Sequence, residues 1–516
     1  MWAVWTLLAV LIVVAIHDLT QKRHAILRNF PIVGHLRYLL EMVGPELRQY
    51  IVTGNNEERP FSRDQRRWVY ASSKRQNNYF GFGTDEEPEM SPHFLIIKQS
   101  AFPLPTLNPD SPGYDPQYRI PCAKVLGAHR GRKKAFRPKS VINISGMSFG
   151  SLSAPAIEAL NRGAAIAECL HNTGEGAISA YHLHGGELIW QIGTGYFGCR
   201  DDNGNFSMDR LVEAVSVSPI RAIEIKLSQG AKPGMGGLLP AAKITPEIAE
   251  IRGIPLGRDC ASPSGHATFG NVDEMLDFVE QIAEATGLPV GIKSAVGESK
   301  FWSDLAHQMV TTDRGVDFIN IDGGEGGTGA APLVFSDHVA LPWKLAFVRV
   351  YREFIERGLH DKVVFGGSGK LGFPDNALLA FSLGCDMIHV AREAMLSIGC
   401  IQAQRCHTGH CPTGVATQSP WLMRGLDPTL KAARVANYIT TLRKEVLALA
   451  CACGHPHPAL VTSDQCEILD GRFGTTTVAD LFNIASFDRW GLPSADDTEA
   501  ITAIMTEEIP ARNASE

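Results

Sequence analysis

From Val141 onward the chain repeats one pattern: a short apolar segment, a turn rich in glycine, and then a helical segment. The apolar segments are too short for helices and are typical of buried strands. Strands that alternate with helices pair in parallel through right-handed crossovers. The predicted strands are 141–145, 222–226, 289–293, 318–322, 362–365 and 387–390, and the predicted helices are 154–167, 272–285, 302–312, 342–357 and 375–383.

Two α/β folds share this alternation, the closed (β/α)8 TIM barrel and the doubly wound open sheet. Several predicted strands are followed directly by polar and glycine residues, at the end where a TIM barrel assembles its active site. The open sheet would usually carry an early G-x-G-x-x-G after a strand. The sequence matches that motif only late, at Gly324–Gly329, and no predicted helix opens directly on it. We therefore predict a (β/α)8 TIM barrel.

The first residues of the chain, Met1–Ile16, are apolar apart from Thr6. They are followed by basic residues, which by the positive-inside rule place the rest of the chain in the cytoplasm. A basic start and a small-residue cleavage site, which a signal peptide needs, are not evident. The alternative is a buried N-terminal helix. We expect a single membrane anchor at 1–20, a lead-in segment at 21–119, the barrel at 120–430 and a C-terminal extension at 431–516.

Composition narrows the class of protein. The formal net charge of -7 gives no reason to expect nucleic acid, whose binders usually carry a basic face. Eleven cysteines, an odd number and mostly scattered, fit a reducing compartment better than a disulfide framework.

Three cysteines break the scattered pattern. Cys400, Cys406 and Cys411 lie in one short segment, and Pro412 follows the last of them. Iron–sulfur clusters are held by Cys thiolates, and some cluster loops carry a Pro after the final ligand. Three thiolates suggest a cluster that lacks one corner. A Cys3His zinc site that uses His407 or His410 is the main alternative, and three thiols that are buried near one another by chance are the other.

Two late strands end in glycine clusters, at 322–329 and 366–370. Glycine lets backbone N–H groups surround an anion, and TIM barrels often hold a phosphate in the loops after the last two strands. The next strand ends near Arg392, which adds a cation. These features favour a phosphate-bearing cofactor such as FMN. The alternative is ordinary tight turns.

Two further turns carry charged side chains. Lys226, Gln229 and Lys232 lie on a loop constrained by Gly and Pro, where paired cations suit a dicarboxylate or a reduced flavin. Glu175 lies on the glycine turn at 172–176 and is a candidate proton carrier. By default such lysines are solvated surface residues, and such a glutamate caps a helix or turn.

Together these motifs resemble a known family. The turn at 172–176, the K-x-x-Q-G-A-K-P-G loop at Lys226–Gly234, the glycine segment at 323–332 and the C-x5-C-x4-C-P segment at 400–412 are similar, in the same order, to the FMN-binding synthase domain of glutamate synthase. The chain particularly resembles the stand-alone, membrane-tethered members of that family. The resemblance covers roughly residues 120–430.

The resemblance implies a TIM barrel with FMN and a 3Fe–4S cluster. It assigns Cys400, Cys406 and Cys411 as cluster ligands and Glu175, Lys226 and Lys232 as catalytic residues. The flavin-binding residues that it implies are Met147, Ser148, Lys226, Gln229, Gly326, Gly327, Thr328, Gly366, Gly367, Ser368, Gly369, Ala391 and Arg392.

The sequence also departs from the family. Met235 stands where the full-length enzymes typically have Glu, and Ala177 replaces a Gly. From the sequence we expect neither an N-terminal glutaminase domain nor a pyridine-nucleotide-binding module. The resemblance therefore implies that ammonia comes from a separate source and electrons from an external donor such as ferredoxin.

The expected function is reduction of the imine of 2-oxoglutarate and ammonia to L-glutamate. Three alternatives stand beside it. In the first, the same cofactors act on another amino or oxo acid. In the second, the chain is a non-catalytic electron carrier or a redox-responsive membrane subunit. In the third, it is a zinc-stabilised barrel that binds a phosphorylated metabolite.

Overall fold

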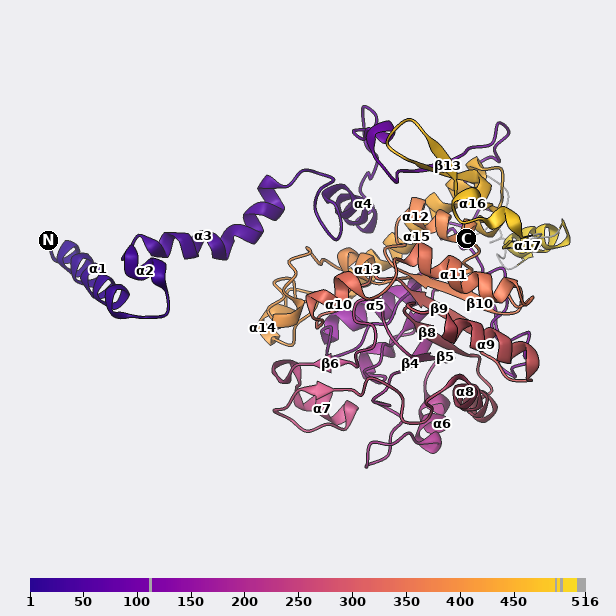
Figure 1. The fold of residues 1–516 in the computed structure, drawn as a ribbon, viewed down its shortest axis with the longest axis horizontal. Helices are drawn as coiled ribbons and strands as arrows, with labels where there is room; N and C mark the ends of the chain where they lie inside the picture. The colour runs from indigo at the N-terminus through magenta and orange to yellow at the C-terminus, as the bar shows by residue number, and fades with distance from the viewer. Residues whose placement is uncertain (111–113, 488–489, 492–494, 508–516) are drawn as a thin grey trace. The chain divides into compact units, whose positions relative to one another are not determined.

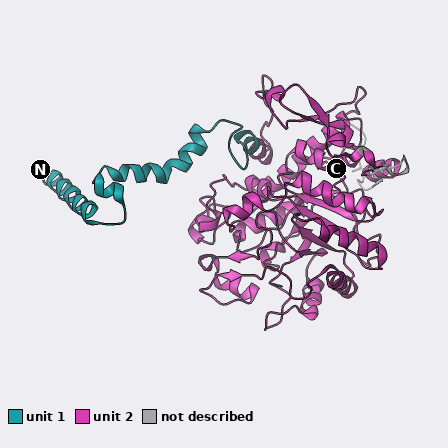
Figure 2. Cartoon of the chain, in the orientation of Figure 1, with its two compact units in different colours: residues 1–67 teal, residues 68–516 magenta. Residues whose placement is uncertain are grey.

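The structure is a computed structural model that describes residues 1–110, 114–487, 490–491 and 495–507. It contains two compact units, residues 1–67 and residues 68–516 (Figure 2).

The first unit is helical. It contains α1 (Trp2–Thr20), α2 (Ala25–Asn29), α3 (Gly34–Leu47) and a π-helical turn at Arg48–Val52. Among the described residues, α1 is the one helix that is long and apolar enough to cross a membrane. At 1.5 Å per residue its 19 residues extend for about 29 Å, close to the hydrocarbon thickness of a bilayer.

The second unit contains a closed barrel of eight strands, in the order β2-β3-β4-β5-β8-β9-β10-β11 (Figure 1). All neighbouring strands are parallel, and β11 pairs with β2 to close the circle. The predicted TIM barrel is confirmed, and the open-sheet alternative is wrong. The strands are β2 (Ile142–Ile144), β3 (His171–Asn172), β4 (Leu188–Ile192), β5 (Ile220–Lys226), β8 (Val290–Ser294), β9 (Phe318–Asp322), β10 (Val364–Ser368) and β11 (Met387–Val390).

Helices follow the strands and cover the barrel (Figure 1). Some of them, such as α5 and α8, begin where the side chain of Ser153 or Asn271 caps the first turn. The helices of this unit are α5 (Ala154–Ala167), α6 (Met208–Val217), α7 (Pro246–Arg252), α8 (Val272–Thr286), α9 (Lys300–Thr311), α10 (Leu333–His338), α11 (Trp343–Ile355), α12 (Pro374–Ser382), α13 (Arg392–Ser397), α14 (Pro420–Met423), α15 (Pro428–Ala452), α16 (Val478–Leu481) and α17 (Ala495–Glu507), while α4 (Arg63–Ser73) lies across the boundary of the two units.

Strands β3 and β4 were not predicted from the sequence, and β10 ends later than predicted. Strand β3 has only two residues, and β4 is separated from it by a 3-10 turn at Ala180–His182 in place of a helix, so neither produced the expected alternation. Strand β10 runs through Ser368, so Gly366 and Gly367 lie inside the strand and not, as predicted, in the turn after it. A Cβ on Gly366 would lie 1.7 Å from Oδ1 of Asn320 on the neighbouring strand, which explains why glycine occupies this strand position.

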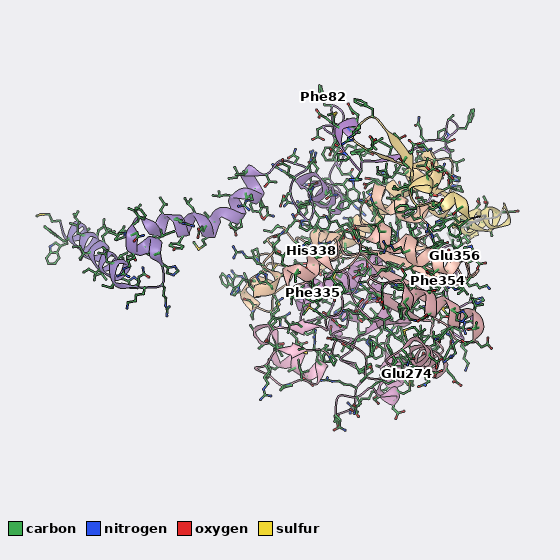
Figure 3. All side chains as sticks on the ribbon, viewed as in Figure 1. Phe82, Glu274, Phe335, His338, Phe354 and Glu356 are labelled. Atoms are coloured by element: carbon green, nitrogen blue, oxygen red, sulfur yellow. The ribbon has the colours of Figure 1, made fainter. Side chains whose placement is uncertain are left out.

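Segments outside the barrel pack on it. Strand β1 (Leu95–Ile97) pairs antiparallel with β12 (Cys466–Leu469), which pairs with β13 (Thr475–Thr477). Helix α15 packs along α5, where a Cβ on Gly163 would lie 2.5 Å from Cβ of Val435. Figure 3 shows Phe82, which is fully exposed, projecting from this unit.

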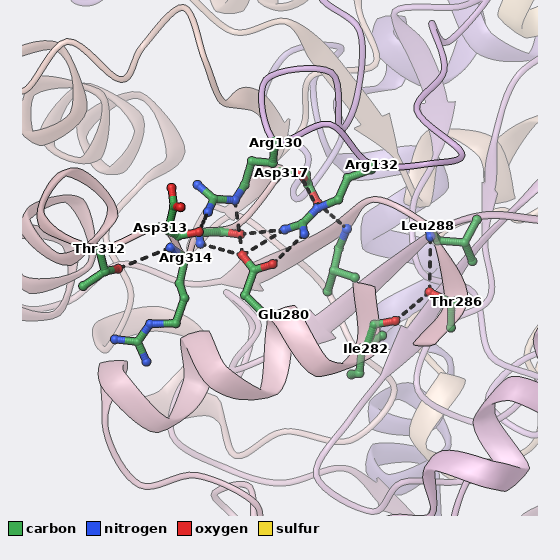
Figure 4. Close-up of polar contacts among 12 residues, drawn as sticks. Arg130, Arg132, Glu280, Ile282, Thr286, Leu288, Thr312, Asp313, Arg314 and Asp317 are labelled. Atoms are coloured by element: carbon green, nitrogen blue, oxygen red, sulfur yellow. Dashed lines mark hydrogen bonds and ion pairs between the residues drawn. The ribbon is translucent and has the colours of Figure 1, made fainter. Parts of the chain in front are cut away.

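An ion network fastens the segment before β2 to the amino ends of β8 and β9 (Figure 4). Arg132 donates from Nε to Asp317 (2.9 Å) and from Nη1 to Glu280 (2.5 Å). Asp317 also accepts a hydrogen bond of 2.7 Å from the backbone N–H of Val290. Burial raises the pKa of Asp317 to about 6, although Arg132 lowers it. This network lies at the end of the strands opposite to the predicted site.

Candidate active site at the carboxyl ends of the strands

A buried ion pair joins two of the predicted catalytic residues. Lys226 is the last residue of β5, and Glu175 lies in the turn after β3. Lys226 donates from Nζ to Oε1 of Glu175 (2.7 Å) and to Oε1 of Gln229 (2.5 Å). The side chains of Lys226 and Glu175 are 10% and 19% exposed. Closure of the barrel therefore brings Glu175 to Lys226 and Gln229, which the sequence placed on a different turn.

The charges in this cluster are set by burial and by one another. Burial opposes ionisation of Glu175, but the charge and hydrogen bond of Lys226, aided by the charges of Lys232 and Arg252, hold the pKa of Glu175 below its usual range. Burial and the charge of Lys226 lower the pKa of Lys232. Glu175 is therefore ionised at neutral pH and available to accept a proton.

Two glycines leave just enough room for the Glu175 carboxylate. A Cβ on Gly193 would lie 2.5 Å from Oε2 of Glu175, and a Cβ on Gly237 would lie 2.8 Å from Oε1. Real Cβ atoms do not approach other atoms so closely, so a side chain at either position would displace the carboxylate.

Arg252, at the end of α7, is a member of the cluster that the sequence did not indicate. Its side chain is buried, its Nη2 donates to the carbonyl of Phe149 (2.9 Å), and its charge acts on Glu175. A Cβ on Gly176 would lie 2.6 Å from Nη2 of Arg252, so the guanidinium lies against the Glu175 turn. An arginine on a short helix that departs from the barrel pattern gives no recognisable sequence signal.

His266 is a second residue that sequence reasoning missed. Its Nε2 donates to the backbone carbonyl of Lys226 (3.0 Å), and its Nδ1 then accepts from the hydroxyl of Tyr196 (3.1 Å). Burial lowers the pKa of His266. A neutral imidazole with this tautomer fixes the backbone of Lys226 from outside the cluster.

The carboxylate of Asp322, at the end of β9, connects the lysine loop to the glycine clusters. It accepts from the backbone N–H of Gly230 (2.8 Å) and from the hydroxyl of Ser368, and it lies 3.6 Å from Nζ of Lys293. A Cβ on Gly230 would lie 1.8 Å from the carbonyl oxygen of Gly323. The lysine loop and the first glycine cluster are thus in direct backbone contact.

Arg392, at the start of α13, lies over the first glycine cluster. It donates from Nη2 to the carbonyl of Glu325, and a Cβ on Gly327 would lie 2.8 Å from its Cδ. Gly326 lies beside Ala231 of the lysine loop. Thr328 is exposed, and Ala391 caps α13. The predicted flavin-binding residues of this loop therefore lie between Arg392 and the lysine loop.

Met147 and Ser148 lie on the Glu175 side of the site. The backbone N–H of Met147 donates to Asn172 (3.1 Å), and its carbonyl accepts from Nε2 of His182 (3.0 Å). A Cβ on Gly174 would lie 2.8 Å from the backbone nitrogen of Ser148. The turn after β2 and the turn after β3 therefore pack directly on each other.

A polar cavity that is too narrow to admit a water molecule lies among the strand ends at the centre of the site. Glu224 accepts from the side-chain amides of Asn172 (2.8 Å), Gln191 (2.6 Å) and Asn320. Among the described residues, Oδ1 of Asn320 and both ring nitrogens of His389 have no hydrogen-bond partner. Burial lowers the pKa of His389 to about 4. The cavity is lined by Ser145, Asn172, Glu224, Lys293, Asn320, Ser368 and His389.

The three cysteines of the 400–411 segment lie next to this site. A Cβ on Gly329 would lie 3.6 Å from Cβ of Cys406. Burial and the neighbouring Cys411 raise the pKa of Cys406. Burial works against the Cys411 thiolate, but backbone N–H groups, first that of Ala416, hold the pKa of Cys411 below its usual range. Cys406 and Cys411 are thus neighbours, and the surroundings of Cys411 favour its thiolate, the form that binds metals.

A second question is whether side chains in this structure are placed to coordinate a single metal ion. Within the described residues no group of three or more His, Cys, Asp or Glu side chains is placed to hold one metal ion. A zinc site requires all its ligands about 2 Å from one point when the ion is bound, and this finding does not decide the zinc alternative. In an iron–sulfur cluster the thiolates bind different irons, so their sulfur atoms do not converge on one point, and the predicted cluster is not tested by this finding.

Comparison with known proteins adds the family. Residues 123–456 match the model of the conserved region in glutamate synthase. The chain is 38% identical over 473 residues to the glutamate synthase large subunit-like protein YerD of Bacillus subtilis, with 86% of this chain and 89% of that protein covered. It is 37% identical over 318 residues to the archaeal glutamate synthase (NADPH) of Methanocaldococcus jannaschii, covering 61% of this chain and 59% of that protein.

Among solved structures, a doubly mutated flavocytochrome b2 with sulfite bound overlaps this chain with a TM-score of 0.44 at 14% identity. The overlap covers 93% of this chain and 98% of that chain.

Proposed function

The chain belongs to the family defined by the conserved region in glutamate synthase, and on that premise we propose that it makes L-glutamate. It is an oxidoreductase. The proposed reaction converts 2-oxoglutarate, ammonium, two electrons and two protons into L-glutamate and water. Ammonia and electrons are supplied from outside the chain.

The observation that carries this proposal is the charge of the buried cluster. Lys226, Lys232 and Arg252 are buried cations, and Glu175 is the anion among them. These four side chains sum to a charge of +2, which matches the two carboxylates of 2-oxoglutarate. Buried charges are costly unless they are paired, so a cluster with two uncompensated cations is suited to a dianion.

Each residue has a distinct task in the proposed reaction. Lys226, Lys232 and Arg252 bind the carboxylates and orient the carbonyl carbon. Glu175, ionised and held by Lys226 at Oε1, accepts the proton of ammonium at Oε2 and so releases ammonia for imine formation. Gly193 and Gly237 leave the room that this carboxylate occupies.

The central polar groups fit a flavin. Oδ1 of Asn320 and the two nitrogens of His389 have no partner in the described part of the chain, and hydrogen-bonding groups of this kind match the polar edge of an isoalloxazine ring. When bound, FMN would supply the hydride that reduces the imine carbon. The residues that would hold it are Met147, Ser148, Lys226, Gln229, Gly326, Gly327, Thr328, Gly366, Gly367, Ser368, Gly369, Ala391 and Arg392.

Cys400, Cys406 and Cys411 are the proposed ligands of a 3Fe–4S cluster. Support comes from the proximity of Cys406 to Cys411 and from the backbone N–H groups that favour the Cys411 thiolate. The buried ammonium of Lys243 lies near both thiols and would balance part of their negative charge. When bound, the cluster would supply one-electron redox chemistry.

We further propose that α1 anchors the enzyme in a membrane with the barrel on the cytoplasmic side. Support comes from the length and apolar composition of α1 and from the basic residues Lys22, Arg23 and Arg28 that follow it.

The test is glutamate formation under anaerobic conditions. The purified protein is reduced with dithionite and methyl viologen, supplied with ammonium and 2-oxoglutarate, and assayed for L-glutamate. Glu175→Gln should lose at least a hundredfold in rate, whereas Glu187→Gln, at a half-exposed residue outside the site, should not. A wild-type protein that binds FMN but forms no glutamate would refute the proposal.

One observation favours a second substrate. Met235, an exposed residue in the turn directly after Lys232, replaces the Glu of the full-length enzymes. The same assay with other 2-oxo acids decides between 2-oxoglutarate and a related substrate, because an oxo acid that turns over faster than 2-oxoglutarate would identify the true substrate.

A further inference from the structure

A basic surface lies next to the cysteine segment. It consists of Lys74 and Arg75, just after α4, and Lys431 and Arg434 in the first turns of α15; the lysine and arginine after α4 are exposed and the other two are partly exposed. Within the described chain no carboxylate lies within 4.0 Å of the charged groups of these four residues. The whole chain has a net charge of -7, so a surface with four cations is opposite in sign to the net charge of the protein.

Hydrogen bonds between the end of α4 and α15 bring the two pairs of cations to one surface. Arg75 donates from Nε to Oδ1 of Asn437 (2.9 Å), and Nδ2 of Asn437 donates to the carbonyl of Ser73 (3.0 Å). These bonds fasten the end of α4 to α15. Burial, together with the charges of Arg434 and Lys74, lowers the pKa of Lys431. Asp427, the N-cap of α15, offsets part of this repulsion.

This surface is in direct contact with the backbone around Cys400. A Cβ on Gly399 would lie 2.9 Å from Nζ of Lys431, so the ammonium lies against the residue that precedes Cys400. The hydroxyl of Tyr70, on α4, donates to the backbone carbonyl of Cys400 (2.7 Å). Helix α4, which directly precedes Lys74 and Arg75, therefore contacts Cys400 itself, and α15 contacts the residue before it.

We infer that Lys74, Arg75, Lys431 and Arg434 form the docking surface for a small acidic electron-carrier protein. The inference rests on the proposed function, which requires electrons from outside the chain. A cationic surface attracts an acidic partner and accelerates its association, and contact at Cys400 shortens the path for an electron. In each encounter one carrier molecule is oxidised by one electron and the enzyme gains it, so two encounters supply one turnover.

Binding and turnover test this surface separately. Binding of an oxidised acidic ferredoxin to the full chain is measured by calorimetry at low and moderate salt. Lys74→Glu and the milder Lys431→Gln should weaken binding by about tenfold and threefold and reduce its salt dependence. Lys134→Glu, an exposed lysine at the opposite end of the barrel, is the matched control and should bind as the wild type does.

Turnover separates this inference from the proposed function. With reduced methyl viologen, Lys74→Glu should form glutamate at the wild-type rate, whereas with reduced ferredoxin it should be about tenfold slower at low carrier concentration. If the wild type forms no glutamate with methyl viologen, the proposed function fails, but the binding measurement still judges the surface. Equal ferredoxin binding by Lys74→Glu and the wild type would overturn the inference. The inference would also be overturned if the same variants lost binding to phosphatidylserine vesicles and kept ferredoxin binding, because the surface would then bind a membrane and not a carrier protein.

Discussion

Nζ of Lys226, the last residue of β5, lies 2.7 Å from Oε1 of Glu175, which belongs to the turn after β3. The pair has a direct chemical consequence. A buried carboxylate would by itself hold its proton, and the neighbouring ammonium reverses that preference.

The pH profile of the enzyme should report this pair. Because Lys226 holds the pKa of Glu175 below its usual range, kcat/KM of the wild type should lose its base only at strongly acidic pH. Lys226→Met removes the cation and leaves burial, so the pKa of Glu175 rises. The acidic limb of kcat/KM should then move to higher pH. Lys226→Arg keeps the charge and should keep the limb, and an unmoved limb in Lys226→Met would contradict this assignment.

Arg252 should control the affinity for the oxo acid. Arg252→Gln removes a buried cation that lies against the Glu175 turn. Loss of a charge-assisted hydrogen bond costs about 1.5–3 kcal/mol, so KM for 2-oxoglutarate should rise roughly 10- to 100-fold. KM for ammonium should change little, because ammonium has no carboxylate. A matched loss in both constants would show that the residue supports the fold and does not bind substrate.

Gly193 should be required for activity although it has no side chain. In Gly193→Ala the new Cβ would lie 2.5 Å from Oε2 of Glu175 and 2.8 Å from its Cβ, so the carboxylate must move. We expect at least a tenfold loss in kcat with flavin absorbance and thermal stability nearly unchanged. Gly265→Ala is the control, because its Cβ would meet no atom within 4 Å.

The cysteines should hold iron and not zinc. Cys406→Ser and Cys411→Ser should each lower the iron and acid-labile sulfide of the purified protein to a small fraction of the wild-type content while FMN remains bound. Cys453→Ser changes a buried thiol outside the segment and should keep full iron content. Stoichiometric zinc without iron in the wild type would contradict the assignment.

The network below the barrel should give a pH-dependent stability with a definite sign. Burial raises the pKa of Asp317 to about 6 from 3.8, so between these values the folded state binds more protons than the unfolded state. The contribution of Asp317 to the free energy of unfolding therefore falls as pH rises through this window, by about 3 kcal/mol at most. Urea unfolding of the wild type and of Asp317→Asn should show this trend in their difference, and a difference independent of pH would refute it.

Some residues of the cluster around Glu175 could be predicted from the sequence and others could not. Lys226, Gln229 and Lys232 share one loop with a distinctive spacing, so they were predicted from the sequence. Arg252 and His266 lie on excursions beyond that loop and carry no motif. Their importance follows from contacts with the Glu175 turn and with the carbonyl of Lys226, and no local pattern encodes those contacts.

The sequence by itself determined the alternation of strands and helices, the glycine turns at the strand ends and the spacing of the cysteines. These features depend on hydrophobic periodicity and backbone freedom, which act over a few residues. The tertiary structure decided which turns meet, why Gly366 and Gly367 lie inside a strand, and which cations surround Glu175. Those outcomes depend on closure of the barrel, which brings residues up to 77 positions apart, such as Glu175 and Arg252, into one site where their charges interact.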